Sequence, residues 1–165
     1  MITLKESIEI KTTHKKIFEW FAHLDENYCS WHPDHVDFRW LKGMPFEEGS
    51  ILYATEYLHG KLHKLRFKIT KVEENERIEF KNLFPVSIIS PKGSFIVELK
   101  GESCIFTATL SFRFGWLLSK LAKNEVEGIK IHMKEEGENL KRLLENEKDL
   151  DKIGIDTYFF DITSM

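Results

Sequence analysis

The chain has 165 residues, of which 42% are hydrophobic and 13% aromatic, with thirteen Phe and a formal net charge of −3 at pH 7. This apolar content excludes intrinsic disorder and predicts a globular protein with an aromatic-rich interior. Because Lys and Arg are scattered among acidic residues, we expect no nucleic-acid partner. We expect residues 1–165 to form one domain, with residues 150–165 as a C-terminal tail.

The sequence also bears on the compartment. No apolar run approaches the roughly 20 residues needed to cross a bilayer, and charged residues come too early for a signal peptide. The two cysteines, Cys29 and Cys104, lie far apart and match no metal or redox spacing, so we expect free thiols in a reducing compartment. The sequence therefore predicts a cytoplasmic protein without a membrane partner.

The N-terminal part of the chain combines strand patterns with two short helical ones. Thr12 and Thr13 precede the first helical pattern and offer an N-cap, and Pro33 ends the second. The expected elements are a strand at Ile2–Ile10, a helix at His14–Leu24, a helix or turn at Asp25–Trp31 and a strand at Val36–Trp40.

The rest of the chain alternates as strands and ends in a long helical pattern. Gly and Pro mark the intervening loops, among them the apolar loop Leu83–Pro91. The expected elements are strands at Ser50–Leu58, Lys64–Val72, Arg77–Phe80, Ser94–Leu99 and Cys104–Phe112, then a helix from Trp116 to Glu147, with a kink near Gly128 or Gly137. The tail Ile153–Met165 is apolar enough to pack on the domain or on a partner.

This order of elements predicts an α+β protein in which one long helix covers an antiparallel sheet. It resembles the helix-grip fold of the START-like or SRPBCC superfamily, a curved sheet wrapped around a C-terminal helix with two short helices after the first strand. The resemblance implies a deep ligand cavity between sheet and helix. Such a fold serves many functions, so the function must be argued from individual residues.

The long helix carries an acidic residue where an apolar one is expected. The residues that recur at steps of three and four mark its core-facing stripe, and they are Val126, Ile129, Met133, Leu140 and Leu144. Glu136 lies inside this stripe, and His132 lies one turn before it. A carboxylate facing a core is costly unless it is paired, protonated or bound to a metal. The spacing of His132 and Glu136 allows both to bind one metal ion.

The segment Tyr28–Val36 contains two histidines three residues apart. His32 and His35 could be metal ligands, a ligand with the carboxylate of Asp34 behind it, or surface residues at a helix end. Pro33 fixes the local backbone and helps to aim His35 at the start of the next strand.

A further acidic residue, Glu56, lies within a strand pattern. By alternation it shares a face with Leu52, Ala54 and Leu58, which places it in the cavity; the alternative is that Tyr53 and Tyr57 point inward instead. With His35, His132 and Glu136, Glu56 would complete a set of two imidazoles and two carboxylates. Such mixed ligation suits a catalytic Zn²⁺, with Mn²⁺ or Fe²⁺ as substitutes.

Two motifs resemble the diacetylphloroglucinol hydrolase and phloretin hydrolase family. Tyr28–Val36 reads Y-x-x-W-H-P-x-H-V, similar to the family's R-Y-x-x-W-H-P-x-D-H-V, and His132–Glu136 matches its late H-x-x-E-E motif. Those enzymes use zinc to hydrolyse a carbon–carbon bond between an acyl group and a phenolic ring. The resemblance implies that the zinc ligands are His35, Glu56, His132 and Glu136.

The resemblance also implies further roles in the site. Tyr28 would be a catalytic or substrate-binding hydroxyl, His32 would line the site, and we expect Trp31 and Tyr53 to contact the substrate. The chain lacks the family's additional N-terminal region, and no histidine lies in residues 94–114 to match its extra catalytic histidine. His63 is the expected substitute, with His59 as the other candidate.

The sequence therefore favours a zinc-dependent hydrolase acting on a small aromatic or carbonyl-containing molecule. The alternative is a non-catalytic protein that binds a small hydrophobic ligand in the same cavity. A third hypothesis is an interaction module built on Tyr158, Phe159 and Phe160, and the apolar tail leaves room for a homodimer.

Overall fold

The computed structural model describes residues 1–113 and 123–153 and contains one seven-stranded sheet. All neighbouring strands are antiparallel, in the order β1-β7-β6-β5-β4-β3-β2. The strands are β1 (Ile2–Ile10), β2 (His35–Lys42), β3 (Ile51–Leu58), β4 (Lys61–Glu73), β5 (Arg77–Asn82), β6 (Lys92–Lys100) and β7 (Ser103–Phe112).

Two short helices and one long helix accompany the sheet. They are α1 (His14–Ala22), α2 (Leu24–Trp31) and α3 (Lys123–Ile153), and a 3₁₀ turn, η1 (Val86–Ile88), lies in the loop between β5 and β6. The predicted cap of α1 is confirmed, because the Thr13 hydroxyl accepts a hydrogen bond from the Lys16 amide at 3.2 Å.

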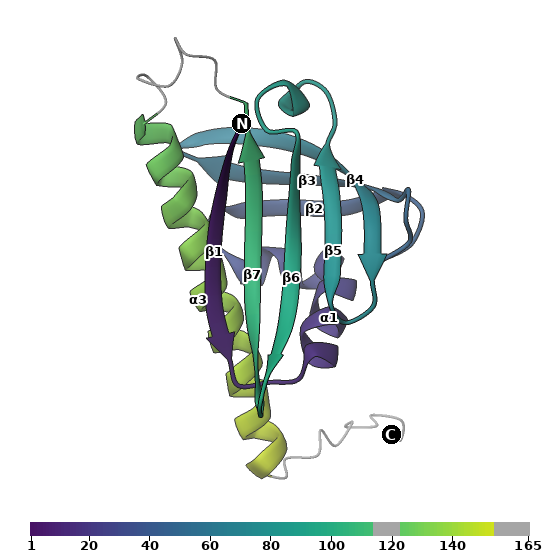
Figure 1. Ribbon diagram of the computed structural model, residues 1–165, viewed down its shortest axis with the longest axis vertical. Helices are drawn as coiled ribbons and strands as arrows, with labels where there is room; N and C mark the ends of the chain where they lie inside the picture. Colours follow the sequence, from purple (N-terminus) through teal and green to yellow (C-terminus); the bar gives the residue numbers. More distant parts are fainter. Residues whose placement is uncertain (114–122, 154–165) are drawn as a thin grey trace, which may run out of the picture.

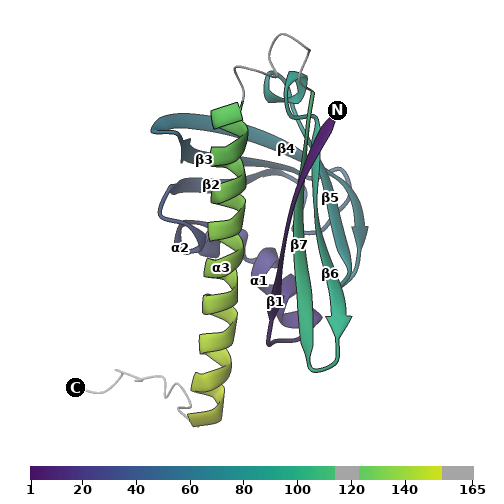
Figure 2. The ribbon, with the colours of Figure 1, turned by 60° about the vertical axis from the view of Figure 1, so that its left-hand side comes forward.

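The long helix α3 runs along one side of the curved sheet, with α1 and α2 beneath the strands (Figures 1 and 2). It packs on the edge strand β1, while α2 packs on the opposite edge strand β2 and also contacts α3. The predicted α+β helix-grip fold of the START-like superfamily is confirmed. The fold brings α2, β2, β3 and α3 together at one place.

Aromatic side chains fill the space between the sheet and the helices. Phe21 of α1 is 1% exposed and stacks on Phe95 and Phe106, with ring centroids 4.9 and 5.6 Å apart, and Trp31 meets its edge. The predicted stripe of α3 faces this core, where Met133, Leu140 and Leu144 are buried. The aromatic-rich interior expected from the composition is therefore a packed core.

Several boundaries differ from the sequence expectation. Strand β2 begins at His35 rather than Val36, because the His35 amide bonds the His32 carbonyl and pairing with β3 starts at His35. The helix α3 extends past Glu147 to Ile153 and continues through Gly128 and Gly137 (Figure 2), where a kink was expected. The expected start of this helix, at Trp116, and the apolar tail after Ile153 lie outside the described residues. Of the helices described, none is long and apolar enough to span a membrane.

Candidate metal centre

Three elements deliver the acidic and imidazole side chains predicted from the sequence to one place. His35 opens β2 and lies directly opposite Glu56 of β3, so both side chains point to the same face of the sheet. His132 and Glu136 lie one turn apart on the face of α3 that meets this end of the sheet.

The imidazole of His35 is fixed in one orientation. Its Nδ1 lies 2.9 Å from the carbonyl oxygen of Tyr28 and donates to it, and its ring stacks on the Tyr28 ring with centroids 3.9 Å apart. Because Nδ1 carries the proton, the neutral ring offers its Nε2 lone pair toward α3. Hydrogen bonds of this kind orient histidine ligands in metal sites.

Glu136 lies between the two histidines. Its Oε1 is 3.1 Å from Nε2 of His35 and 3.7 Å from Nε2 of His132. Both Nε2 atoms are buried, and within the described part of the chain neither has a hydrogen bond of full geometry, so the Glu136 carboxylate is the ion-pair partner of both. The ligand atoms of His35, His132 and Glu136 all lie within 4.8 Å of one another. Two buried lone pairs aimed at one carboxylate fit a divalent cation such as Zn²⁺.

Glu56 lies beside this group of three, on the side of the sheet. Its Oε2 is 3.7 Å from Nε2 of His35 and accepts a hydrogen bond of 2.8 Å from the Tyr28 hydroxyl. Burial, together with the charge of Glu136, raises the pKa of Glu56 to about 7. The phenol of Tyr28 is itself buried beside Glu56, and its pKa is raised, so it stays protonated as a donor.

The pKa values of His132 and His35 are shifted in opposite directions. Burial lowers the pKa of His132, which keeps its imidazole neutral and available as a ligand. Burial acts in the same direction on His35, but the nearby carboxylates of Glu136 and Glu56 outweigh it and raise the pKa of His35. A cation at this point would therefore replace a proton as the partner of the carboxylates.

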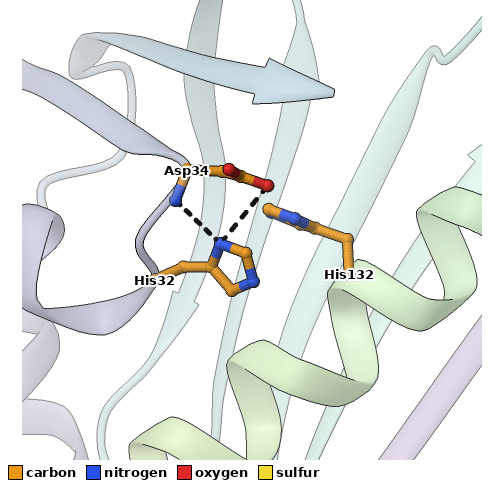
Figure 3. A group of neighbouring side chains, drawn as sticks. All are labelled: His32, Asp34 and His132. Carbon is orange, nitrogen blue, oxygen red and sulfur yellow. Dashed lines mark hydrogen bonds and ion pairs between the residues drawn. The ribbon is translucent and has the colours of Figure 1, made fainter. Parts of the chain in front are cut away.

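A second group beside the first contains His32, Asp34 and His132 (Figure 3), with ligand atoms within 4.8 Å of one another. The Nδ1 atom of His32 accepts the Asp34 amide at 3.1 Å, which leaves the proton on Nε2, 3.1 Å from Oε2 of Glu135. Both nitrogens of His32 are thus already used in hydrogen bonds. The group around His35 is the better metal site, and His32 belongs to its rim.

A narrow cleft of about 120 Å³ lies beside His132, between α3 and the turn that joins β3 and β4. His59 stands in this turn with its Nδ1 2.9 Å from Oε2 of Glu125, and it also lines the cleft. Gly128 permits this approach, because a Cβ there would lie 1.8 Å from Nε2 of His59. The cleft leads from solvent to His132, and His59 stands over it.

Not every residue expected in the site is brought to it. Tyr53 lies on the opposite face of β3, where the Arg39 guanidinium carbon is 5.2 Å from its ring centre, so the structure does not bring Tyr53 to the group around His35. Trp31 is 4% exposed in the aromatic core, and its indole N–H donates to the Glu136 carbonyl at 2.9 Å. It positions the helix that carries Glu136. His63 lies opposite Glu56 in the register and is half-buried.

Sequence reasoning missed three contacts of the site. They are the Trp31 bond to the α3 backbone, the His32–Glu135 pair and the His59–Glu125 pair. Each contact joins residues far apart in the chain. Only the His32–Glu135 pair had a signal in the sequence, because Glu135 belongs to the H-x-x-E-E motif.

Residues 1–145 match the family described as polyketide cyclase / dehydrase and lipid transport. No curated protein sequence matches the chain. A protein from Thermus thermophilus superimposes with a TM-score of 0.72 at 12% identity, over 88% of this chain and 99% of that chain. A START superfamily protein from Mycobacterium smegmatis superimposes with a TM-score of 0.62 at 16% identity, over 87% of this chain and 97% of that chain. The di-domain ARO/CYC protein BexL from the BE-7585A biosynthetic pathway gives 0.66 at 12% identity, over 86% of this chain and 46% of that chain. At these identities the likeness concerns the fold.

Proposed function

The chain belongs to the polyketide cyclase / dehydrase and lipid transport family, and from this premise we propose that it binds a small hydrophobic molecule and hydrolyses it with the help of a divalent metal ion, most readily Zn²⁺. The ligands would be His35, Glu56, His132 and Glu136. The observation that carries the proposal is the convergence of the buried Nε2 atoms of His35 and His132 on the Glu136 carboxylate, at 3.1 and 3.7 Å.

The finer proposal is hydrolysis of a carbon–carbon bond in an acyl-phenol, as in the diacetylphloroglucinol and phloretin hydrolases. Its support is the agreement between the two family motifs and the convergence of the residues they contain. In this reaction water adds its hydroxyl to the acyl carbon and a proton to the ring carbon, giving a carboxylic acid and the free phenol. When bound, a zinc ion supplies Lewis acidity toward the carbonyl and makes water a nucleophile near neutral pH.

The protein's own residues supply position and protons. The Tyr28 hydroxyl donates to the Glu56 carboxylate and would be the hydroxyl that orients a phenolic substrate there. The ring carbon needs an acid, and His59 is the candidate at the mouth, since its imidazole lines the cleft beside His132 and its Nδ1 lies 2.9 Å from Oε2 of Glu125. His63, beside Glu56 on β4, is the second candidate for this proton.

The metal site is tested first, by metal content. Purified protein loaded with zinc and then desalted is expected to retain about one equivalent by mass spectrometry. His132→Ala and Glu136→Ala should lose most of it, because each removes a ligand. Glu138→Ala is the matched control, since Glu138 lies on the exposed face of the same helix and pairs only with Lys134 at 3.8 Å. Wild-type protein that stays metal-free after loading would overturn the proposal.

The reaction is tested on acyl-phenols such as diacetylphloroglucinol, with release of acetate as the measurement. Zinc-loaded wild type should release acetate, and chelated protein and Glu136→Ala should not. A protein that holds zinc but releases no acid from any acyl-phenol would remove the finer proposal and leave the metal site.

A second candidate function is non-catalytic binding of a hydrophobic molecule, and the family description, which includes lipid transport, favours it. The Glu136 carboxylate would then be a buried partner of His35, at 3.1 Å, without a metal. Retention of ligand affinity after chelation, with no turnover, distinguishes this function from the hydrolase.

A further inference from the structure

Lysines from three neighbouring strands form a row on the outer face of the sheet. The register places Lys68 of β4 opposite Lys81 of β5, and Lys81 opposite Lys92 of β6. Directly opposite residues share a face, and this face is the outer one, because the adjacent Phe80 and Gly93 face the core. Like charges in such cross-strand pairs destabilise a sheet. The row therefore has a cost that packing does not explain.

Among the residues that the structure describes, no carboxylate forms an ion pair with this row of lysines. Neither Lys68, Lys81 nor Lys92 has an ion-pair partner there, and the nearby Glu79 lies 3.3 Å from Arg77. The whole chain carries a net charge of −3, so a local excess of cations stands out. Such an excess attracts an anionic partner.

An exposed apolar loop lies beside the lysine row. The loop between β5 and β6, which carries η1, starts just after Lys81 and ends just before Lys92 (Figure 1). Its apolar side chains are turned to solvent, with exposed fractions of 70% for Phe84, 61% for Ile88 and 52% for Ile89. A group of exposed apolar side chains at one loop marks an interaction site more often than isolated ones do.

Two hydrogen bonds to backbone carbonyls hold the loop in place. The Arg66 guanidinium donates to the Phe84 carbonyl at 3.2 Å, and the Arg113 amide donates to the Ile89 carbonyl at 2.7 Å. An open pocket of about 570 Å³ beneath the loop is lined by three cations, one carboxylate and apolar loop residues, among them Lys81, Lys92, Arg113, Glu79 and Phe84. Cations and apolar groups thus face solvent together at one end of the sheet.

We propose that this end of the sheet docks on an anionic lipid bilayer, with Phe84, Ile88 and Ile89 entering the interface and the lysine row facing the headgroups. The combination of charge and apolar surface favours a bilayer, since a soluble anion would use the cations and leave the apolar loop exposed. The inference is independent of the metal centre, because none of its residues lies in that site.

The test is co-sedimentation of purified protein with vesicles at low ionic strength. Wild type should sediment with vesicles of equal parts phosphatidylglycerol and phosphatidylcholine, remain in solution with phosphatidylcholine alone, and be released by added salt. Replacing both Lys81 and Lys92 by Gln should weaken binding roughly tenfold, since each cation near an anionic surface contributes a few-fold. The double variant Phe84→Ser with Ile88→Ser should weaken it as well.

Matched controls come from elsewhere on the surface. Lys5→Gln removes an exposed cation and Leu99→Ser removes an apolar side chain that is 68% exposed, and both should bind vesicles as wild type does. Thermal unfolding of each variant establishes that it is folded. Absence of binding to anionic vesicles, equal binding to neutral ones, or equal losses in the control variants would overturn the proposal. Binding of glycerol phosphate without vesicle binding would also overturn it and leave a soluble-anion site.

Discussion

At the scale of single residues, Glu56 links the proposed metal site to stability. Its pKa is raised from 4.5 to about 7 by burial and by Glu136. In the metal-free protein, the folded state therefore holds a proton on Glu56 between about pH 4.5 and pH 7, where the unfolded chain has released it. Stability consequently falls as the pH rises through this window, and the loss is complete above it.

We therefore predict that Glu56→Gln stabilises the metal-free protein above pH 7, by roughly 1–3 kcal/mol, while weakening zinc binding. The amide oxygen still accepts the Tyr28 hydroxyl, so the hydrogen bond is kept. Glu56 also helps to raise the pKa of His35. The stability that protonated His35 contributes is therefore likewise lost as the pH rises. Urea unfolding at pH 5 and pH 8 with chelator present measures the effect. A variant less stable than wild type at pH 8 would contradict it.

Gly128 permits a second prediction at this scale. Gly128→Ala should displace the His59 ring, because the new Cβ would lie 1.8 Å from its Nε2, while zinc content stays at the wild-type level. If His59 supplies the proton, the rate of acetate release falls. Gly137→Ala is the matched variant, since its nearest atom outside the helix backbone is Ile8 Cγ2 at 3.5 Å, and it should leave the rate unchanged. Equal rates in both variants would exclude His59 as the acid.

The individual site residues differ in how far the sequence reveals them. Glu136 was predicted because a carboxylate interrupts an apolar stripe, and Glu56 because strand alternation places it with Leu52 and Ala54, which are buried. That same alternation turns Tyr53 to the opposite face, so the alternative in which Tyr53 points inward does not hold together with an inward Glu56. The His59–Glu125 pair depends on the turn after Leu58 and on Gly128, and the sequence does not indicate that these two places meet.

At the scale of elements, the close approach of β5 and β6 depends on Gly93. A Cβ at this position would lie 2.6 Å from Cζ of Phe80 and 2.7 Å from the Thr109 carbonyl oxygen. The backbone carbonyl cannot yield easily, so we predict that Gly93→Ala lowers the free energy of unfolding by about 1–3 kcal/mol. Glu98→Ala, exposed on the same strand, should change it by less than about 0.5 kcal/mol in the same urea titration. If Gly93→Ala were as stable as wild type, the strands around position 93 would be able to make room for a Cβ at no cost in free energy.

The elements themselves were largely predictable, because periodicity is a local property. The stripe of α3 and the alternation of the strands gave the fold class and the order of elements. The strand register was not predictable, and it creates both the His35–Glu56 pair and the row of Lys68, Lys81 and Lys92. In the sequence these lysines look scattered, which is why composition gave no sign of a basic surface.

At the scale of the whole molecule, the metal centre joins parts that are remote in the chain. His35 and Glu56 belong to the sheet, whereas His132 and Glu136 belong to the helix that grips it. In the metal-free protein, Glu56 and Glu136 repel each other across this junction, and after burial this repulsion is the next cause of the raised pKa of Glu56. A cation bound there would convert this repulsion into a cross-link between sheet and helix.

We therefore predict that zinc stabilises the whole fold. A ligand that binds only the folded state at about 100 times its Kd adds about 2.7 kcal/mol, which corresponds to roughly 5–10 °C in Tm for a chain of this size. Calorimetry with and without zinc measures the shift. His132→Ala and Glu136→Ala should abolish it, and Glu138→Ala should keep it, because Glu138 faces away from the site. A shift of equal size in all three variants would place the bound zinc elsewhere, whereas a shift confined to wild type and Glu138→Ala would locate it at the junction of sheet and helix.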